Sequence, residues 1–218
     1  MGTFALKSAM EAVYLSKIRG WGIIRRYLGR QIIPNNIYKS KKKLNLGSGN
    51  LPLPTYINVD ILKERKPDIV CDVRKLDFAK ENEYDLIRAS HILEHFELSQ
   101  CRQILIDWRR ALRKGGYLII CVPDYEALSW RVILDPSGLK LDDETYKNGW
   151  ISGLFALGLP LEFRHKIIFT YKTLRDLLND SGFKTIGRLN YFKEEPHILG
   201  INDNSCNLFS LNLAAIKI

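Results

Sequence analysis

Segments with a strand-like pattern of apolar residues and segments with a helix-like pattern follow one another along most of the chain. Short, nearly continuous apolar runs are typical of strands that are buried on both faces. The predicted strands are Lys43–Leu46, Tyr56–Val59, Asp68–Cys71, Asp85–Ala89, Tyr117–Val122, Phe183–Leu189 and Leu208–Lys217. Apolar residues at helical spacing predict a helix from about Ser99 to Arg113, ended by Gly115-Gly116, and another between Thr170 and Gly182. This order predicts an α/β fold with a doubly wound, mostly parallel, seven-stranded sheet.

The first fifth of the chain differs from the rest. Residues 4–30 carry a narrow apolar stripe at helical spacing, although Gly20 and Gly22 leave two shorter helices as an alternative. Residues 1–43 hold ten Lys or Arg and one acid, so the whole net charge of +9 lies in this segment. We therefore expect a basic amphipathic helical arm over residues 1–43 and a separate, electrically neutral body over residues 44–218.

A basic arm indicates an anionic partner. Residues 1–30 fit an anionic membrane surface, and packing against the body or against a second subunit in a homodimer stays open. Nucleic acid is disfavoured because the positive charge does not continue across the body. No apolar run approaches the ~20 residues that a spanning helix needs, and the four cysteines show no disulfide or metal spacing. We expect a cytoplasmic protein, with peripheral attachment to the inner face of the membrane as the alternative.

Residues 125–169 interrupt the alternation of strands and helices. The segment is rich in aromatic residues and poor in strand signals, so it predicts a cap inserted into the body. Most of these aromatic side chains fit a small core of their own. One or two of them are candidates for stacking on an acceptor.

The first predicted strand runs into a glycine turn, Gly47-Ser48-Gly49. Glycine lets the backbone bend sharply and approach a ligand where a Cβ atom would clash. The second strand ends at Asp60, whose carboxylate can accept hydrogen bonds from two ribose hydroxyls. The ten residues between Gly49 and Asp60 include two prolines and are too few for a normal crossover helix. These features predict a nucleoside pocket and argue against a dinucleotide site.

The chain resembles class I S-adenosylmethionine-dependent methyltransferases, and within them a bacterial subgroup associated with polysaccharide biosynthesis. The resemblance depends on five segments in the family's order. They are Leu-Asn-Leu-Gly-Ser-Gly (44–49), Ile-Asn-Val-Asp (57–60), Cys-Asp-Val-Arg-Lys-Leu-Asp-Phe (71–78), Ser-His-Ile-Leu-Glu-His-Phe (90–96) and Leu-Arg-Lys-Gly-Gly-Tyr-Leu-Ile-Ile-Cys-Val-Pro-Asp (112–124). Two features depart from the family: Asn45 stands where many relatives carry an acid, and the third glycine of the longer loop is missing.

The resemblance implies the Rossmann-like methyltransferase fold, S-adenosylmethionine as cofactor and a role for individual residues. The glycine turn would pass beneath the methionine part, Asp60 would bind the ribose, and Asp72 and Val73 would face the adenine. Ser90 and His91 would lie nearest the transferred methyl group. The implied cofactor-binding residues are Gly47, Ser48, Gly49, Asp60, Ile61, Asp72, Val73 and Ser90.

Methyl transfer to a hydroxyl requires alignment of the nucleophile and removal of its proton, a task that suits a histidine. His91 is the first candidate for the base, Asp124 the second and His165 the third, with a surface or hinge role as the alternative for His165. His91, Glu94 and His95 also match the H-x-x-E-H pattern of inverted zinc peptidases. No metal is predicted, because the segment follows a strand of a nucleoside-binding sheet and no acidic third ligand stands out.

We therefore predict an enzyme that methylates a hydroxyl of a saccharide or lipid-linked glycan, with the saccharide implied by the subgroup resemblance alone. Two alternatives stay open. One is a methyltransferase that acts on RNA or a small metabolite. The other is a non-catalytic, membrane-associated adaptor that keeps the fold.

Overall fold

The structure is a computed structural model that describes residues 41–50, 52–134, 156, 160–189 and 210–218. The predicted helix of the basic arm and most of the predicted cap lie outside these residues. The same holds for the expected contact of residues 1–30 with a membrane surface. None of the described helices is long and apolar enough to cross a membrane.

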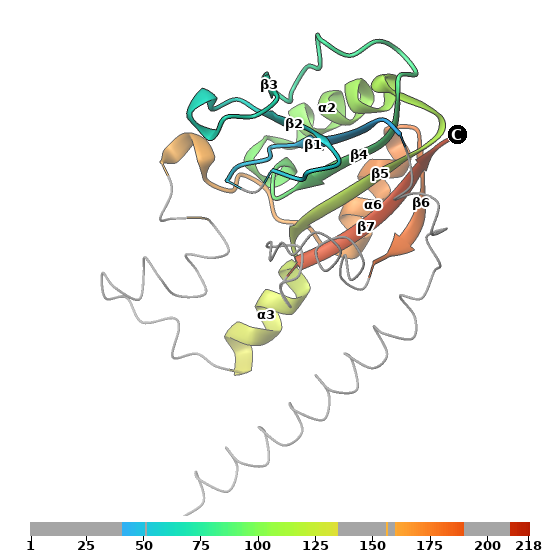
Figure 1. Ribbon diagram of the computed structural model, residues 1–218. Coiled ribbons are helices and arrows are strands. Elements are labelled where there is room, and N and C mark those ends of the chain that lie inside the picture. Colours follow the sequence, from blue (N-terminus) through green and yellow to red (C-terminus); the bar gives the residue numbers. More distant parts are fainter. Residues whose placement is uncertain (1–40, 51, 135–155, 157–159, 190–209) are drawn as a thin grey trace, which may run out of the picture.

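The described strands form one seven-stranded sheet in the order β3-β2-β1-β4-β5-β7-β6 (Figure 1). Neighbouring strands are parallel except that β7 runs antiparallel to both β5 and β6. The predicted fold is thus confirmed, with strand ends shifted by a few residues. The strands are β1 (Lys43–Leu46), β2 (Ile57–Asp60), β3 (Ile69–Val70), β4 (Tyr84–Ser90), β5 (Leu112–Pro123), β6 (Phe183–Arg188) and β7 (Ser210–Lys217).

Two helices, α2 (Leu98–Ala111) and α6 (Tyr171–Asp180), pack against the sheet and contact each other. Their apolar side chains share one core cluster with the strands, in which Trp108 of α2 and Leu178 of α6 are fully buried. As predicted, Thr170 is the N-cap of α6, and its side chain accepts a hydrogen bond from the Thr173 amide (3.2 Å). The remaining described helices are α3 (Tyr125–Leu134) and the short 3-10 helices η1 (Lys63–Arg65), η2 (Leu93–His95) and η4 (Leu161–Phe163).

The prediction that Gly115-Gly116 ends the helix before β5 is wrong. Helix α2 ends at Ala111, and the chain enters β5 at Leu112, which is fully buried opposite Tyr84. The register then shifts, so that a bulge lies where Gly115 adopts a φ of 73°. These glycines therefore serve a bulge inside the strand, because burial of Leu112 already fixes the end of the helix.

The strand order reverses between β1 and β4, since β2 and β3 lie beyond β1 and the later strands lie beyond β4. Open α/β sheets bind ligands outside the carboxyl ends of the strands at such a switch point. Among the described residues between β1 and β2 there are only turns and bends, which confirms that the first crossover helix is reduced. The ends of β1, β2 and β4 thus meet at one edge without a full helix over the first of them.

Candidate functional site

The turn after β1 contains two glycines with different surroundings. Gly47 (φ 63°) and Gly49 (φ 54°) both adopt left-handed backbone conformations. A Cβ atom on Gly47 would lie 1.9 Å from Cδ1 of Ile92, whereas a Cβ atom on Gly49 would meet nothing within 4 Å. The amide of Ser48 donates to the carbonyl of Val59 (3.1 Å) and ties the turn to β2. A side chain at position 47 would therefore overlap Ile92 unless Ile92 moved, whereas Gly49 faces open space.

Asp60 is the last residue of β2, and two backbone amides hold its carboxylate. Oδ2 accepts a hydrogen bond from the Gly49 amide (2.8 Å), and Oδ1 accepts one from the Leu62 amide (2.9 Å). A carboxylate oxygen has two acceptor positions, so each of these oxygens can accept a further bond. The next residue, Ile61, exposes 52% of its surface although it is large and apolar. This edge therefore presents an oriented acid beside an exposed apolar side chain.

Asp72 and Val73 follow β3 and are held in different ways. The Asp72 carboxylate is 35% exposed and binds the guanidinium of Arg74 (2.5 Å). Hydrogen bonds from Arg74 lower the pKa of Asp72 in spite of partial burial. The Val73 side chain is buried in the core, and its carbonyl accepts a hydrogen bond from Nε1 of Trp108 (2.8 Å). Asp72 is thus available at the surface, whereas Val73 anchors the segment to α2.

The chain turns sharply where β4 ends. Ser90 is the last residue of β4 and lies opposite Cys121 of β5. The following residue, His91, has a φ of 54°, a conformation that non-glycine residues rarely adopt. Its amide donates to the carbonyl of Cys121 (2.9 Å), which fixes the turn against β5. Such local strain is often found at functional sites.

The His91 ring is held from both sides. Nδ1 lies 3.0 Å from Oε1 of Glu94, and Nε2 lies 3.2 Å from Oγ of Ser210 and 3.4 Å from Sγ of Cys121. Burial alone would lower the pKa of His91, but Cys121 and Glu94 outweigh it and raise this pKa well above its usual value. Burial likewise opposes ionisation of Glu94, yet the bond to His91 keeps the pKa of Glu94 low. Both pKa shifts favour the charged forms, so the half-buried His91 ring and the buried Glu94 carboxylate stabilise each other's charge.

Asp124, the second candidate for the base, is almost fully buried and binds its own surroundings. Oδ1 accepts a hydrogen bond from the Ala127 amide (3.2 Å) at the start of α3, and Oδ2 lies 4.0 Å from the Arg188 guanidinium. Asp124 also forms an isolated bridge with Phe169. The bond to the Ala127 amide is the contact of a helix cap at the start of α3.

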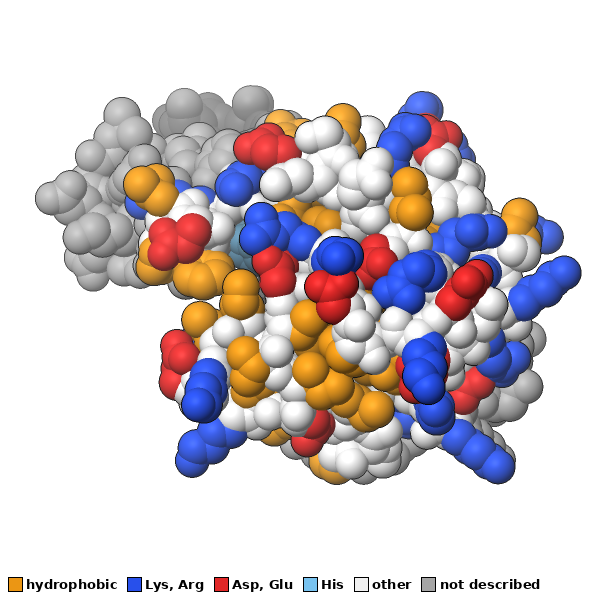
Figure 2. All heavy atoms as spheres, turned by 90° about the horizontal axis from the view of Figure 1, so that it is seen from above, with side chains coloured by type: hydrophobic (Ala, Val, Ile, Leu, Met, Phe, Trp, Pro, Cys, Tyr) orange, Lys and Arg blue, Asp and Glu red, His pale blue; other side chains and the backbone are white. Residues whose placement is uncertain are grey.

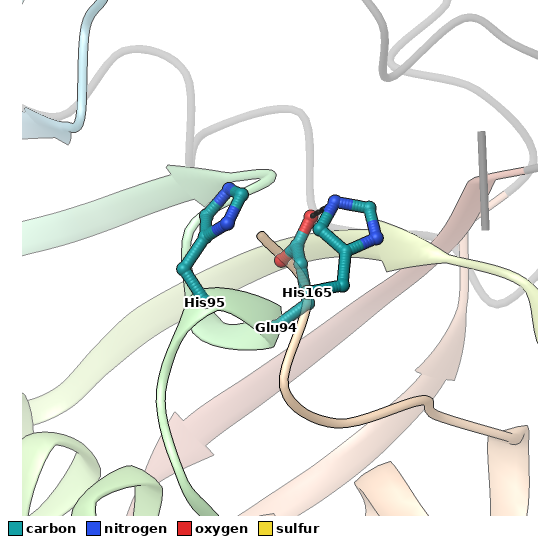
Figure 3. A group of neighbouring side chains, drawn as sticks. All are labelled: Glu94, His95 and His165. Carbon is teal, nitrogen blue, oxygen red and sulfur yellow. Dashed lines mark ion pairs between the residues drawn. The ribbon is translucent and has the colours of Figure 1, made fainter. Parts of the chain in front are cut away.

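His165, the third candidate, does reach the same cluster. Its side chain is 9% exposed, and Nε2 lies 3.9 Å from Oε1 of Glu94. Its ring centroid is 5.0 Å from that of His95. Figure 3 shows Glu94 and His95 on η2, with His165 approaching from the segment after η4. His91 and His165 thus converge on one buried acid.

Sequence reasoning missed the central place of Glu94. The H-x-x-E-H spacing was a usable signal for it, but the partners that complete the cluster come from distant segments. Ser210 lies 119 positions from His91, and only the pairing of β7 with β5 brings them together. No local pattern could have shown this contact.

The charge on the face seen from above is mixed. Figure 2 shows hydrophobic side chains gathered near its middle, with Lys or Arg and Asp or Glu side chains around them. Neither sign of charge forms a continuous stripe in this view. On this face, the described residues therefore form no continuous basic stripe of the kind that contacts a nucleic-acid backbone.

Comparison with known proteins agrees with this architecture. Residues 24–120 match the family model described as a methyltransferase domain. A comparison with curated proteins found no match. Among solved structures, an S-adenosylmethionine-dependent methyltransferase from Mesorhizobium loti is 15% identical, with a TM-score of 0.50 over 81% of this chain and 90% of that one.

Two further structures cover nearly the whole chain. One, from Thermotoga maritima and described as a possible histamine N-methyltransferase, is 16% identical, with a TM-score of 0.51 over 96% of this chain and 99% of that one. The other is 1,6-didemethyltoxoflavin-N1-methyltransferase from Burkholderia thailandensis with bound S-adenosylhomocysteine. It is 16% identical, with a TM-score of 0.50 over 97% of this chain and 87% of that one. At these identities the likeness shows the fold.

Proposed function

We propose that the chain is a class I S-adenosylmethionine-dependent methyltransferase, and that it methylates a hydroxyl of a saccharide or lipid-linked glycan. One observation carries the hydroxyl part of the proposal. The His91–Glu94 pair lies directly after β4, at the switch point of the sheet, where a proton acceptor is needed for oxygen methylation. The saccharide part is supported by the resemblance of the sequence segments to the polysaccharide-associated subgroup.

The described residues fit the cofactor at the ends of β1 and β2. The open side of Gly49 leaves room for the methionine part above the Gly47-Ser48-Gly49 turn. The Asp60 carboxylate, already oriented by two amides, accepts the ribose hydroxyls with its remaining acceptor positions. The exposed apolar surface of Ile61 fits the adenine ring.

Two further residues and the end of β4 complete the proposed cofactor site. Asp72 faces the adenine amino group while it keeps its bond to Arg74, and Val73 supports the ring from the core side. Ser90 lines the site next to the methyl group.

Bound S-adenosylmethionine supplies a sulfonium methyl group whose leaving group needs no activation. As the acceptor oxygen bonds to the methyl carbon, the carbon–sulfur bond breaks and its electrons stay on sulfur. The hydroxyl proton passes to the neutral form of the His91 imidazole, which Glu94 holds in place. Its raised pKa makes His91 a stronger proton acceptor, although a smaller share of the molecules is unprotonated at neutral pH.

The test is a transfer assay with full-length protein and S-adenosylmethionine labelled in the methyl group. Separate reactions contain saccharides, lipid-linked glycans, total RNA and small amines. We expect label in the carbohydrate fractions as an alkali-stable ether, with the methyl position assigned by NMR spectroscopy. Label only in RNA or in amines contradicts the proposal.

Calorimetric titration with S-adenosylhomocysteine distinguishes an enzyme from the remaining alternative, a non-catalytic adaptor. We expect saturable binding at one site per chain. A protein without such binding is the non-catalytic adaptor, and the enzymatic proposal then fails.

A further inference from the structure

Three side chains next to His91 form a compact group of metal-ligand type. Glu94, His95 and His165 each offer one ligand atom, and these atoms all lie within 4.8 Å of one another (Figure 3). Backbone bonds hold the two segments together, because the Lys166 amide donates to the carbonyl of Glu94 (2.8 Å). The three positions are therefore fixed by the fold.

The hydrogen bond of His95 determines which of its ring nitrogens is free. Nε2 lies 3.2 Å from the carbonyl oxygen of His91. A carbonyl oxygen can only accept, so Nε2 carries the proton and Nδ1 presents its lone pair. Nδ1 is buried and has no hydrogen-bond partner among the described residues. Metal-binding histidines are usually oriented in this way, with the second ring nitrogen bound to a carbonyl or carboxylate.

Glu94 presents a second electron-rich atom at the same place. Its side chain is 1% exposed, and Oε1 is bound to Nδ1 of His91. Oε2 is buried and has no hydrogen-bond partner among the described residues. A buried carboxylate oxygen without a donor is costly in free energy. Two such acceptors side by side call for a cation or for a donor between them.

We propose that Glu94, His95 and His165 bind one divalent transition-metal ion. Two imidazoles and one carboxylate suit borderline ions such as Zn²⁺ or Co²⁺. Three protein ligands leave coordination positions open for oxygen ligands. Resting on the proposed function, we infer that these positions hold hydroxyl oxygens of the acceptor beside His91.

The zinc-peptidase pattern would have used His91 and His95 instead. The structure turns His91 towards Ser210 and Cys121 and brings in His165 from the returning segment. The ligand set thus could not be derived from the spacing of the motif.

Metal binding is tested without any turnover. Full-length protein is treated with EDTA, dialysed and titrated calorimetrically with ZnCl₂, and the visible absorption of the Co²⁺-loaded protein is recorded. We expect one site per chain and absorption bands typical of nitrogen ligation. His165→Ala and Glu94→Gln should each weaken Zn²⁺ binding by at least about tenfold. This is the lower end of the loss caused by replacing residues that only orient metal ligands, and a direct ligand should matter at least as much.

Two variants serve as controls. Asp77→Asn removes an exposed acid that pairs with Lys75 and should leave the Zn²⁺ affinity unchanged. His95→Ala provides a second ligand deletion if His165→Ala does not fold, which circular dichroism and thermal unfolding will show. The absence of stoichiometric Zn²⁺ binding, or equal affinity in all variants, overturns the proposal and leaves a buried water as the donor between Glu94 and His95.

The outcomes also separate this inference from the proposed function. Stoichiometric Zn²⁺ binding that depends on His165, together with methylation of amines only, supports the metal site and overturns the hydroxyl acceptor. Methylation of saccharides by a protein that binds no metal overturns the metal site alone.

Discussion

The two halves of the carboxyl edge of the sheet are held by different kinds of contact, backbone hydrogen bonds in one and side-chain contacts in the other. At the ends of β1 and β2, backbone amides of Gly49 and Leu62 orient one acid, Asp60. At the end of β4, side chains orient one another, because His91 binds Glu94 and Glu94 in turn approaches His165. The proposed cofactor half is thus held by the main chain, whereas the proposed acceptor half depends on the identity and charge of each side chain.

This difference teaches where substitutions should act. A change in the proposed cofactor half should alter backbone geometry or cofactor affinity. A change in the proposed acceptor half leaves the backbone in place and alters proton transfer or the binding of a cation. The predictions that follow test this division, beginning with the largest effect.

Replacement of His91 should affect the rate and spare cofactor binding. Asparagine is the suitable substitute because it tolerates the left-handed conformation that His91 adopts. His91→Asn should lower kcat by about 10²- to 10⁴-fold, the usual contribution of a general base. Steady-state kinetics with the acceptor found in the transfer assay and calorimetry with S-adenosylhomocysteine measure the two quantities. A kcat close to that of the parent protein removes His91 from its proposed role.

Alanine at the two glycines of the first turn should give unequal losses of stability. Each substitution places a side chain in a left-handed conformation, which costs about 1–2 kcal/mol. Only Gly47→Ala adds an overlap with Ile92, and overpacking of this kind costs about 1–3 kcal/mol more. The free energy of unfolding in urea should therefore fall further for Gly47→Ala than for Gly49→Ala.

The affinity for S-adenosylhomocysteine should follow the opposite order and fall further in Gly49→Ala than in Gly47→Ala. A methyl group on Gly49 projects into the open space assigned to the cofactor, so Gly49→Ala should weaken S-adenosylhomocysteine binding although it stays folded. Equal losses of stability and equal affinities in the two variants would mean that Ile92 yields and that the space above Gly49 is not used.

The turn and the strand ends of the proposed cofactor half could be predicted from the sequence because these parts are close in the chain. Gly47, Gly49 and Asp60 lie within 14 positions, and the strands on either side are short apolar runs that propensity and pattern identify. Gly115 shows the limit of that approach, since a glycine after a helix is a common stop signal but here serves a bulge. The helix ends before Leu112 because this residue is buried in β5 opposite Tyr84. Such a tertiary contact cannot be read from the local sequence pattern.

The proposed acceptor half could be predicted only in part. The sequence marks His91 as a candidate because it follows a strand, and His165 because it lies at the end of an inserted segment. That both approach Glu94 depends on the return of the chain beside η2, where the Lys166 amide bonds to the Glu94 carbonyl. Contacts of this kind follow from tertiary packing and leave no periodic trace in the sequence.

Removal of the charge of Asp60 should weaken cofactor binding with little effect on the chemical step. Asp60→Asn keeps the size of the side chain but loses one charge-assisted acceptor, which is worth about 1–3 kcal/mol. The dissociation constant for S-adenosylhomocysteine should rise by about 5- to 150-fold in calorimetry. Asp77→Asn, which alters an exposed acid in the loop that follows β3, is the matched control and should leave this dissociation constant unchanged. If the two variants bind equally well, Asp60 does not contact the ribose.

The smallest predicted effect concerns the charge of His91 in metal-free protein. Although burial opposes the charged form, Cys121 and Glu94 raise its pKa well above 6.5, so the imidazole should stay protonated at pH 6.5 and lose its proton only at more alkaline pH. NMR titration of the ring nitrogens after EDTA treatment measures this midpoint, and His91→Asn identifies the signal. Glu94→Gln removes the neighbouring carboxylate and should move the midpoint towards lower pH. A midpoint that stays the same in Glu94→Gln would show that the Glu94 carboxylate does not control the pKa of His91. The contrast between the two halves of the carboxyl edge would then lose its electrostatic basis.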